Sequence, residues 1–266
     1  MTWQNQGIGH HSVAVSEGRG MLHDTGELMP SPKRHRYRPP GTPHDIRLDD
    51  LLAYCHRRVE DSHNDLFRKA GEAEPIIHFA GKLDLLRRPC VSVIGARAVS
   101  PEGKARAARI ARELAKADIV VVSGLAKGVD QAAHQASIDS GGRTVAVIGT
   151  PLDKAYPAEN GELQEAIWRD HLLISQFRPG QRTFPSDFPK RNRLMAAITD
   201  ASIIVEASDT SGTLHQAAEC ARLGRWLFIM RSVVENPKLT WPKKFIGLPK
   251  VAVLTDPTDV IARVSR

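Results

Sequence analysis

Short runs of apolar residues recur along the chain from about residue 90, and most of them are continuous rather than alternating with polar residues. They lie at 90–95, 119–124, 144–149, 172–175, 202–207, 226–230 and 251–254. A continuous apolar run is typical of a strand that is buried on both faces, as in a parallel sheet covered by helices. Helical segments separate these runs. This alternation predicts an α/β fold with a doubly wound, mostly parallel sheet.

The segment 100–117 shows how one of these helices is specified. Ser100 can cap a helix start, and Pro101 suits the first helical position. Its apolar residues fall on one stripe that can face a sheet, namely Ala107, Ile110, Ala111 and Leu114.

The pattern of residues 45–71 predicts another helix. Asp45 or Asp49 could cap its start, and Gly71 could end it. The apolar face would comprise Leu48, Leu51, Leu52, Val59 and Leu66. We therefore expect a helical lead-in segment at 45–75, followed by the α/β domain at 76–266.

The first 44 residues differ from the rest in composition, with many Gly, Pro, His and Ser residues and little apolar periodicity. Lys33, Arg34, Arg36 and Arg38 lie among prolines, which prevent regular structure at this density. The segment 1–44 is predicted to be a flexible basic arm, which either contacts a polyanion or is a solvated tail.

Composition narrows the classes of protein. The chain has 266 residues, of which 41% are hydrophobic and 25% charged, so collagen-like, wholly disordered and coiled-coil folds are excluded. No apolar run approaches the roughly 18 residues of a membrane helix, and the N-terminus lacks the pattern of a secretory signal. Cys55, Cys90 and Cys220 have no metal-type spacing. We expect reduced thiols, a cytoplasmic location, no membrane association, and no metal or cofactor.

The charge balance favours an acidic partner. Lys and Arg number 37 against 30 for Asp and Glu, which gives a formal net charge of +7. Such an excess suits nucleic acid, nucleotides or an acidic membrane, although a basic surface without a partner has the same composition.

Ligands of open α/β sheets bind outside the carboxyl ends of the strands, so the loops that follow the apolar runs are the candidate sites. In the first loop, 95–103, the strand ends at Gly95 and a helix begins near Ser100, with Arg97 between them. A helix start and a guanidinium together make an anion site. Alternatively, Arg97 pairs with a neighbouring carboxylate.

The second loop, 123–134, places Lys127 in a tight turn between Gly124 and Gly128. Asp130 and His134 follow four residues apart on one helical face. A hydrolytic triad with Ser123 lacks the GxSxG elbow, so we favour a structural role for Asp130 and His134.

Two further segments carry similar chemistry. Ser211, Gly212 and Thr213 open a helix after the run 202–207, and they suit either a phosphate or a simple helix cap. In the helix at 188–197, Lys190, Arg191 and Arg193 surround Asn192 in the first turn, where cations oppose the helix dipole. They are expected to face an anion or an acidic patch. In the loop before it, Phe184 or Phe188 could stack on a base.

These segments, in this order, resemble the DNA-processing protein A family, which is also called DprA or Smf. The resemblance covers about 76–230. It is carried by Gly95-Ala96-Arg97, Ser123-Gly124-Leu125-Ala126-Lys127-Gly128-Val129-Asp130, Ala133-His134, Gly141-Gly142, Leu152-Asp153, Tyr156-Pro157, Asn160, Phe188-Pro189-Lys190-Arg191-Asn192-Arg193, Val205-Glu206-Ala207 and Ser211-Gly212-Thr213-Leu214.

The resemblance implies an extended Rossmann-like domain that binds single-stranded DNA, protects incoming strands in natural transformation and helps to load RecA. It further implies a homodimer and no catalytic turnover. By motif match, the DNA-contacting positions would be Arg97, Lys127, Lys190, Arg191 and Arg193.

The chain departs from the family pattern at several positions. Ala96 stands where Ser is usual, Pro151 where Gly is common, and Gln176 where Glu is typical. After Met230 the family's Pro-Gly and Gly-x-Asn-x-Leu-Ile patterns are missing. Only a strand and a short helix fit into 250–266, so we expect no winged-helix extension and a divergent, minimal member.

Two other functions use the same loops. A nucleotide-sensing domain would bind a small anionic ligand and signal to a partner. A nucleotide phosphoribohydrolase similar to the lysine-decarboxylase-like LOG group would need a carboxylate at the ribosyl bond. Here His215 and Gln216 stand where those acids would be, and Glu206 and Glu219 are the nearby candidates.

Overall fold

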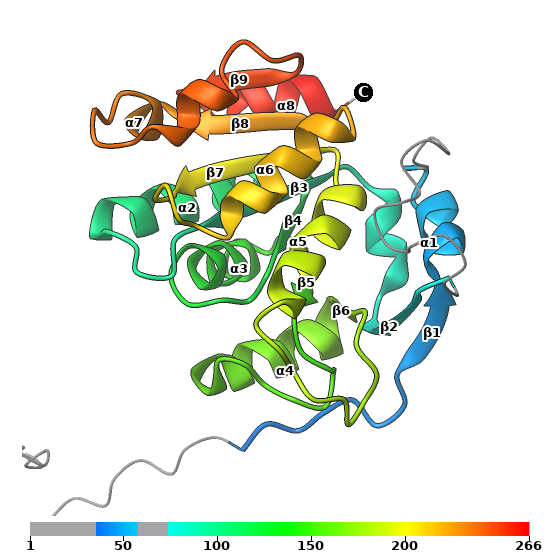
Figure 1. Cartoon of the computed structure of the whole chain (residues 1–266). Helices are drawn as coiled ribbons and strands as arrows, with labels where there is room; N and C mark the ends of the chain where they lie inside the picture. Colours follow the sequence, from blue (N-terminus) through cyan, green and yellow to red (C-terminus); the bar gives the residue numbers. More distant parts are fainter. Residues whose placement is uncertain (1–35, 58–73, 266) are drawn as a thin grey trace, which may run out of the picture. The chain divides into compact units, whose positions relative to one another are not determined.

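The computed structural model describes residues 36–57 and 74–265, which form a nine-stranded sheet covered by helices (Figure 1). The strands are β1 (His44–Arg47), β2 (Ile76–Gly81), β3 (Cys90–Gly95), β4 (Val120–Ser123), β5 (Thr144–Ile148), β6 (Leu172–Ser175), β7 (Ala201–Glu206), β8 (Trp226–Met230) and β9 (Val251–Leu254). The α-helices are α1 (Leu48–Tyr54), α2 (Pro101–Lys116), α3 (Val129–Asp139), α4 (Gly161–Asp170), α5 (Asp187–Ala197), α6 (Thr213–Arg222), α7 (Arg231–Val234) and α8 (Thr258–Val264). Short 3-10 helices are η2 (Leu83–Arg87), η3 (Ala158–Asn160) and η4 (Trp241–Lys244).

The sheet is doubly wound, as the apolar runs predict. Its strand order is β1-β2-β6-β5-β4-β3-β7-β8-β9, and every neighbouring pair from β6 to β9 is parallel. The chain winds outward from β3 to β6 and then returns to the other side of β3 to form β7. The strand order therefore reverses between β3 and β7, which is the switch point where such sheets bind ligands.

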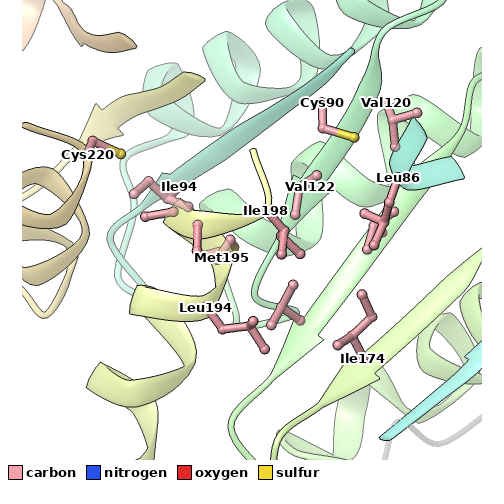
Figure 2. Packing of buried hydrophobic residues seen from close by; sticks show 14 of the residues in the cluster. Leu86, Cys90, Ile94, Val120, Val122, Ile174, Leu194, Met195, Ile198 and Cys220 are labelled. Carbon is pink, nitrogen blue, oxygen red and sulfur yellow. The ribbon is translucent and has the colours of Figure 1, made fainter. Parts of the chain in front are cut away.

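Helices cover both faces of the sheet. The helices α2, α3 and α8 pack on one face over Val91, Val93 and Val121, and α4 packs over Ala146 and Leu173. On the opposite face, α1, α5 and α6 pack over strand residues that alternate with these. Figure 2 shows Leu194, Met195 and Ile198, at the end of α5, beside Ile94 and Val122 of the sheet.

The start of α2 forms as its sequence predicts. The Ser100 hydroxyl accepts a hydrogen bond from the Gly103 amide at 2.9 Å, and Pro101 occupies the first helical position. The stripe of Ala107, Ile110, Ala111 and Leu114 is buried against the sheet.

The predicted helix over 45–71 is wrong in its first part. Residues 44–47 form β1, which pairs antiparallel with β2, and Asp45 bonds His78 across that pair at 2.6 Å instead of capping a helix. Leu48, Leu51 and Leu52 are buried as expected, but on a short helix. Val59, Leu66 and Gly71 lie outside the described residues.

The end of the predicted flexible arm is docked rather than free. The Tyr37 hydroxyl donates to the Leu152 carbonyl at 2.7 Å, and the Trp168 indole donates to the Arg38 carbonyl at 3.1 Å. The Arg38 guanidinium pairs with the Glu165 carboxylate at 3.0 Å. Contacts unite residues from Arg36 onward into one compact unit, so segments expected to precede the domain share its sheet and core. Lys33 and Arg34 lie outside the described residues.

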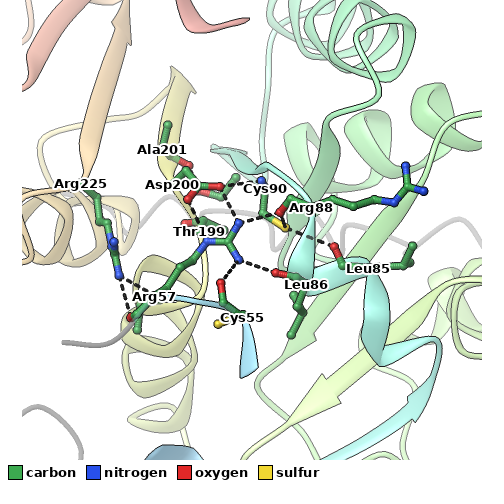
Figure 3. Close-up of polar contacts among 12 residues, drawn as sticks. Cys55, Arg57, Leu85, Leu86, Arg88, Cys90, Thr199, Asp200, Ala201 and Arg225 are labelled. Atoms are coloured by element: carbon green, nitrogen blue, oxygen red, sulfur yellow. Dashed lines mark hydrogen bonds and ion pairs between the residues drawn. The ribbon is translucent and has the colours of Figure 1, made fainter. Parts of the chain in front are cut away.

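An ion pair between the buried Arg57 and the partly exposed Asp200 ties the segment before residue 58 to the sheet (Figure 3). The Arg57 guanidinium donates to both Asp200 carboxylate oxygens, at 2.9 and 2.5 Å, and to the carbonyls of Leu86 and Arg88, at 2.5 and 2.7 Å. Asp200 also accepts from the Cys90 amide at 2.8 Å. This network joins the starts of β3 and β7 at the edge opposite the switch-point site.

Replacing Asp200 with Ala is expected to leave the Arg57 charge buried without its counter-ion. The free energy of unfolding should fall by about 3 kcal/mol, measured by chemical denaturation. Adding Arg57→Met to Asp200→Ala should recover part of the loss. A loss below about 0.5 kcal/mol for Asp200→Ala would show that the pair does not stabilise the fold.

Candidate functional site

A cavity of about 280 Å³ opens at the switch point between β3 and β7. Gly95 and Arg97 line it from the end of β3, Arg191 and Asn192 line it from α5, and residues 211–213 line it from the start of α6. These three segments, which are distant in sequence, thus meet at the carboxyl ends of the strands. The structure brings together most of the residues that the sequence singles out.

Arg191 lies beneath this cavity rather than on the surface, with only 6% of its side chain exposed. Nη1 donates to the carbonyl of Val147 at 2.9 Å and to that of Gly124, while Nε donates to Asn192 Oδ1 at 2.8 Å. One guanidinium therefore links the ends of β4 and β5 to α5. Burial lowers the pKa of Arg191, and the nearby Asp130 carboxylate opposes this effect.

Two glycines in the second loop have a steric role. A Cβ on Gly124 would collide with the Arg191 guanidinium, so a side chain there is incompatible with this contact. Gly128 has φ +83°, in the left-handed region, and a Cβ there would collide with the carbonyls of Ala96 and Arg97. Gly124 thus leaves room for the Arg191 side chain from α5, and Gly128 allows the first and second loops to lie close together.

Asn192 extends the same connection to α6. Its Nδ2 donates to the Gly212 carbonyl at 3.1 Å. The Ser211 hydroxyl accepts from the Thr213 amide at 3.2 Å and donates to the Thr213 hydroxyl at 2.9 Å. The Ser211 hydroxyl thus turns the backbone just before the N-cap residue of α6, Gly212, which is exposed, and the loop lines the cavity.

Arg97 is exposed at the mouth of the cavity. Its guanidinium carbon lies 5.1 Å from the centre of the Phe188 ring, and that ring lies 5.5 Å from the ring of Tyr156. Within the described residues, no carboxylate oxygen lies within 4.0 Å of the Arg97 guanidinium. The alternative in which Arg97 pairs with a neighbouring carboxylate is therefore not realised among residues 36–57 and 74–265.

The remaining predicted cations have different surroundings. Lys127 pairs with Glu159, and both side chains are more than half exposed, so this pair is weak and can open. Lys190 pairs with the buried Asp187 at 3.2 Å. Arg193 is exposed and forms no ion pair in the described part of the chain. Lys127 and Arg97 both line a second cavity of about 60 Å³ beside the first.

The helix start at Ser100 already has an anion from the protein itself. Glu206, the last residue of β7, accepts from the Ser100 hydroxyl at 2.8 Å and from the Ser100 amide at 3.4 Å. The Ala96 amide donates to the Glu206 carbonyl at 2.7 Å, beside Gly95. The sequence predicted that this helix start would be open to an external anion. In the structure Glu206, which lies 106 residues further along the chain, bonds it instead.

Asp130 and His134 are buried in the structure and stabilise the loop and the sheet. Asp130 accepts from the amides of Gly124 and Ala126 at 3.1 and 3.4 Å, and burial raises the pKa of its carboxyl group. The Thr144 hydroxyl donates to the Val121 carbonyl, so His134 Nδ1 donates to Thr144 at 2.6 Å. The predicted structural role of both residues is confirmed.

The hydrolytic triad is not assembled. The Ser123 hydroxyl donates to the Val93 carbonyl at 2.7 Å, and His134 Nδ1 is committed to Thr144. Burial lowers the pKa of His134 to about 3, so its imidazole is neutral at physiological pH and cannot accept a proton readily.

Comparison with known proteins identifies a family for this chain. The sequence model of the family described as DNA recombination-mediator protein A matches residues 56–265. The chain belongs to this family. It is 41% identical over 157 residues to DNA processing protein DprA of Streptococcus pneumoniae, which covers 59% of this chain and 55% of that protein. The match thus spans about half the length of this curated relative.

Two solved structures share the fold. That of DprA from Streptococcus pneumoniae has a TM-score of 0.70 at 32% identity and covers 84% of this chain and 75% of that one. That of DNA processing protein A from Helicobacter pylori, described for its unique single-stranded DNA binding mode, has a TM-score of 0.64 at 27% identity. It covers 74% of this chain and 90% of that one. The extended Rossmann-like fold implied by the resemblance is confirmed.

The described residues bear on three further expectations. Cys55, Cys90 and Cys220 are all unbridged and buried, as predicted for thiols. No helix in 36–57 or 74–265 has the length and apolar character to span a membrane. No group of three or more His, Cys, Asp or Glu side chains in these ranges could hold a metal ion.

The neutral His134 makes stability depend on pH. The pKa of His134 in the folded protein is about 3, below the ordinary value of 6.5, so the unfolded chain binds a proton more readily. The contribution of His134 to the free energy of unfolding is therefore fully present above pH 6.5 and is lost as the pH falls toward 3. Between about pH 7.5 and 5, the wild type should lose roughly 2 kcal/mol of unfolding free energy through this group. His134→Gln should show a shallower loss in denaturation curves over this range. An equal pH dependence in both proteins would contradict this assignment.

Proposed function

We propose that this chain binds single-stranded DNA across the carboxyl ends of β3, β4, β5 and β7, as a DNA-processing and recombination-mediator protein and not as an enzyme. The observation that carries the proposal is the exposed Arg97 guanidinium, which lies on the Phe188 ring at the mouth of the switch-point cavity and has no described carboxylate within 4.0 Å. The single-stranded DNA binding mode described for the Helicobacter pylori relative supports it.

The residues of the site divide into those that meet the strand and those that shape the site. Exposed cations would contact phosphates, namely Arg97, Lys127, Lys190 and Arg193. The backbone and hydroxyls of Ser211, Gly212 and Thr213 would bind a further phosphate at the start of α6. Gly95, Ser100, Gly124, Gly128 and Asn192 position these groups. Arg191 acts from below, as a structural tie that adds positive potential to the cavity.

Exposed aromatic side chains favour single-stranded DNA over duplex DNA as the ligand. Tyr156 and Phe184 are each 49% exposed, and the Arg182 guanidinium lies 5.6 Å from the centre of the Phe184 ring. Stacking on such rings needs an unpaired base and tolerates any sequence. The cavity of about 280 Å³ suits a single nucleotide unit more than a duplex.

The family resemblance also leads us to propose a homodimer and RecA as a partner. The first has support in the sheet itself: β9 is an edge strand, and Ile246, Leu248 and Val253 around it are exposed apolar side chains. A second copy pairing along this edge would cover them. The RecA partnership rests on the resemblance alone.

The hydrolase alternative loses its candidate acids in this geometry. Glu206 is bonded to Ser100, and Glu219 pairs with Arg222 at 2.6 Å. Release of free base from a nucleoside monophosphate would nevertheless support it. The sensor alternative would be favoured if a mononucleotide displaced an oligonucleotide at micromolar rather than millimolar concentration.

Arg97→Ala should weaken binding to single-stranded DNA of any sequence. Because each lost phosphate contact removes counter-ion release, the slope of log affinity against log salt should flatten by about 0.7. Fluorescence anisotropy over a salt series measures this slope. Arg112→Ala is the matched control, since it removes the same charge from an exposed position further along α2, toward the amino ends of the strands.

Three results would contradict the proposal. The wild type could bind no single-stranded DNA at low salt, it could prefer duplex DNA, or Arg97→Ala could leave the slope unchanged while Arg112→Ala flattens it.

A further inference from the structure

The segment 231–250 is the part of the chain where the family's sequence pattern is missing, and it is strongly basic. It contains Arg231, Lys238, Lys243, Lys244 and Lys250 against the single carboxylate of Glu235. It follows β8, whose carboxyl end lies at the same edge of the parallel sheet as those of β3 and β7. The part of the segment that follows β8 therefore begins on the edge that carries the proposed DNA site, whereas Lys250, which donates to the Gly224 carbonyl just before β9, lies at the opposite edge.

A single turn connects this segment to the switch-point cavity. In the turn 208–211, the Ser211 amide donates to the Ser208 carbonyl at 3.1 Å, and Ser211 lines the cavity. Asp209, within the same turn, accepts from the Thr240 amide at 3.0 Å, the Thr240 hydroxyl at 2.9 Å and the Trp241 amide at 2.8 Å. The start of η4 is thus bonded to the turn whose other end forms the cavity wall.

A buried anchor holds η4 in place. Trp241 is only 1% exposed, its indole donates to the Ala207 carbonyl at 3.1 Å, and the centres of its ring and the Phe245 ring lie 5.9 Å apart in an edge-to-face arrangement. The two lysines that follow Pro242 are consequently presented on a fixed backbone rather than on a loose loop.

Lys243 and Lys244 are exposed on this fixed backbone. In the part of the chain that the structure describes, neither ammonium group, nor that of Lys238, has a carboxylate oxygen within 4.0 Å. The Asp209 carboxylate, although close to Lys244, is used by Thr240 and Trp241. The adjacent like charges of Lys243 and Lys244 repel one another, Asp209 compensates only one of them, and a polyanion would relieve the remaining repulsion.

We propose that Lys238, Lys243 and Lys244 form a second phosphate-binding surface, which continues the path of the same single strand past the α6 side of the cavity. This inference rests on the proposed function, because the strand must first occupy the switch-point site. The surface would contact only those nucleotides that extend beyond the cavity, so it should matter for long oligonucleotides and not for short ones.

The test compares a Lys243→Ala/Lys244→Ala double variant with the wild type on oligo-dT of about 6 and about 20 nucleotides, a range that brackets typical single-strand sites. Salt slopes are measured by fluorescence anisotropy. Loss of two phosphate contacts should flatten the slope for the long strand by about 1.4 and leave the slope for the short strand unchanged. Thermal unfolding verifies that the variant, changed only at exposed positions, remains folded.

The matched control is Arg112→Ala/Lys116→Ala, which removes the same charge from exposed positions on the last turns of α2, at the opposite edge of the sheet. It should leave both slopes unchanged. An equal flattening in both double variants would show a general charge effect and overturn the second surface.

The outcomes separate this inference from the proposed function. If the wild type binds neither oligonucleotide, the proposed function fails. If the wild type binds both and the lysine variant retains both slopes, only the second surface is overturned. If the variant flattens both slopes equally, the lysines belong to the primary site and no second surface exists.

Discussion

The buried guanidinium of Arg191 is the contact on which the site depends. It satisfies carbonyls at the ends of β4 and β5 and aligns Asn192, which in turn holds the loop before α6. Separate strands would otherwise end in loops with unpaired carbonyls beside a cavity, which is costly away from water. Gly124 leaves the space that this side chain needs. The positive charge at the centre of the site is thus bonded to the protein's own backbone and to Asn192, and it stabilises the site without a ligand.

Charges at this edge of the sheet consequently divide into two groups. The two carboxylates form hydrogen bonds within the protein: Glu206 with Ser100 at the start of α2, and Asp130 with amides of the second loop. Arg97 and Arg193 remain exposed without an ion pair in the described residues, and Lys127 has only an exposed partner. Internal anions fix the backbone while cations face outward, and this arrangement gives the edge a positive field, as the proposed binding of a phosphodiester strand requires.

The sequence predicted the parallel strands and α2 because continuous apolar runs and a Ser-Pro helix start are local signals. It also predicted which loops converge, since carboxyl ends of parallel strands share one edge. It missed β1 and β2, whose antiparallel pairing depends on residues about 30 apart, and it missed the docking of Tyr37 and Arg38. The burial of Arg191 and the use of Ser100 by Glu206 are likewise long-range, so no local pattern signalled them.

The most direct test of this account is the free energy of unfolding of Arg191→Lys, measured by chemical denaturation against the wild type. A lysine keeps the charge but cannot bond two carbonyls and Asn192 together, so the account predicts a loss of about 2 kcal/mol. A loss below about 0.5 kcal/mol would contradict it, because the strand ends would then be held together without the guanidinium.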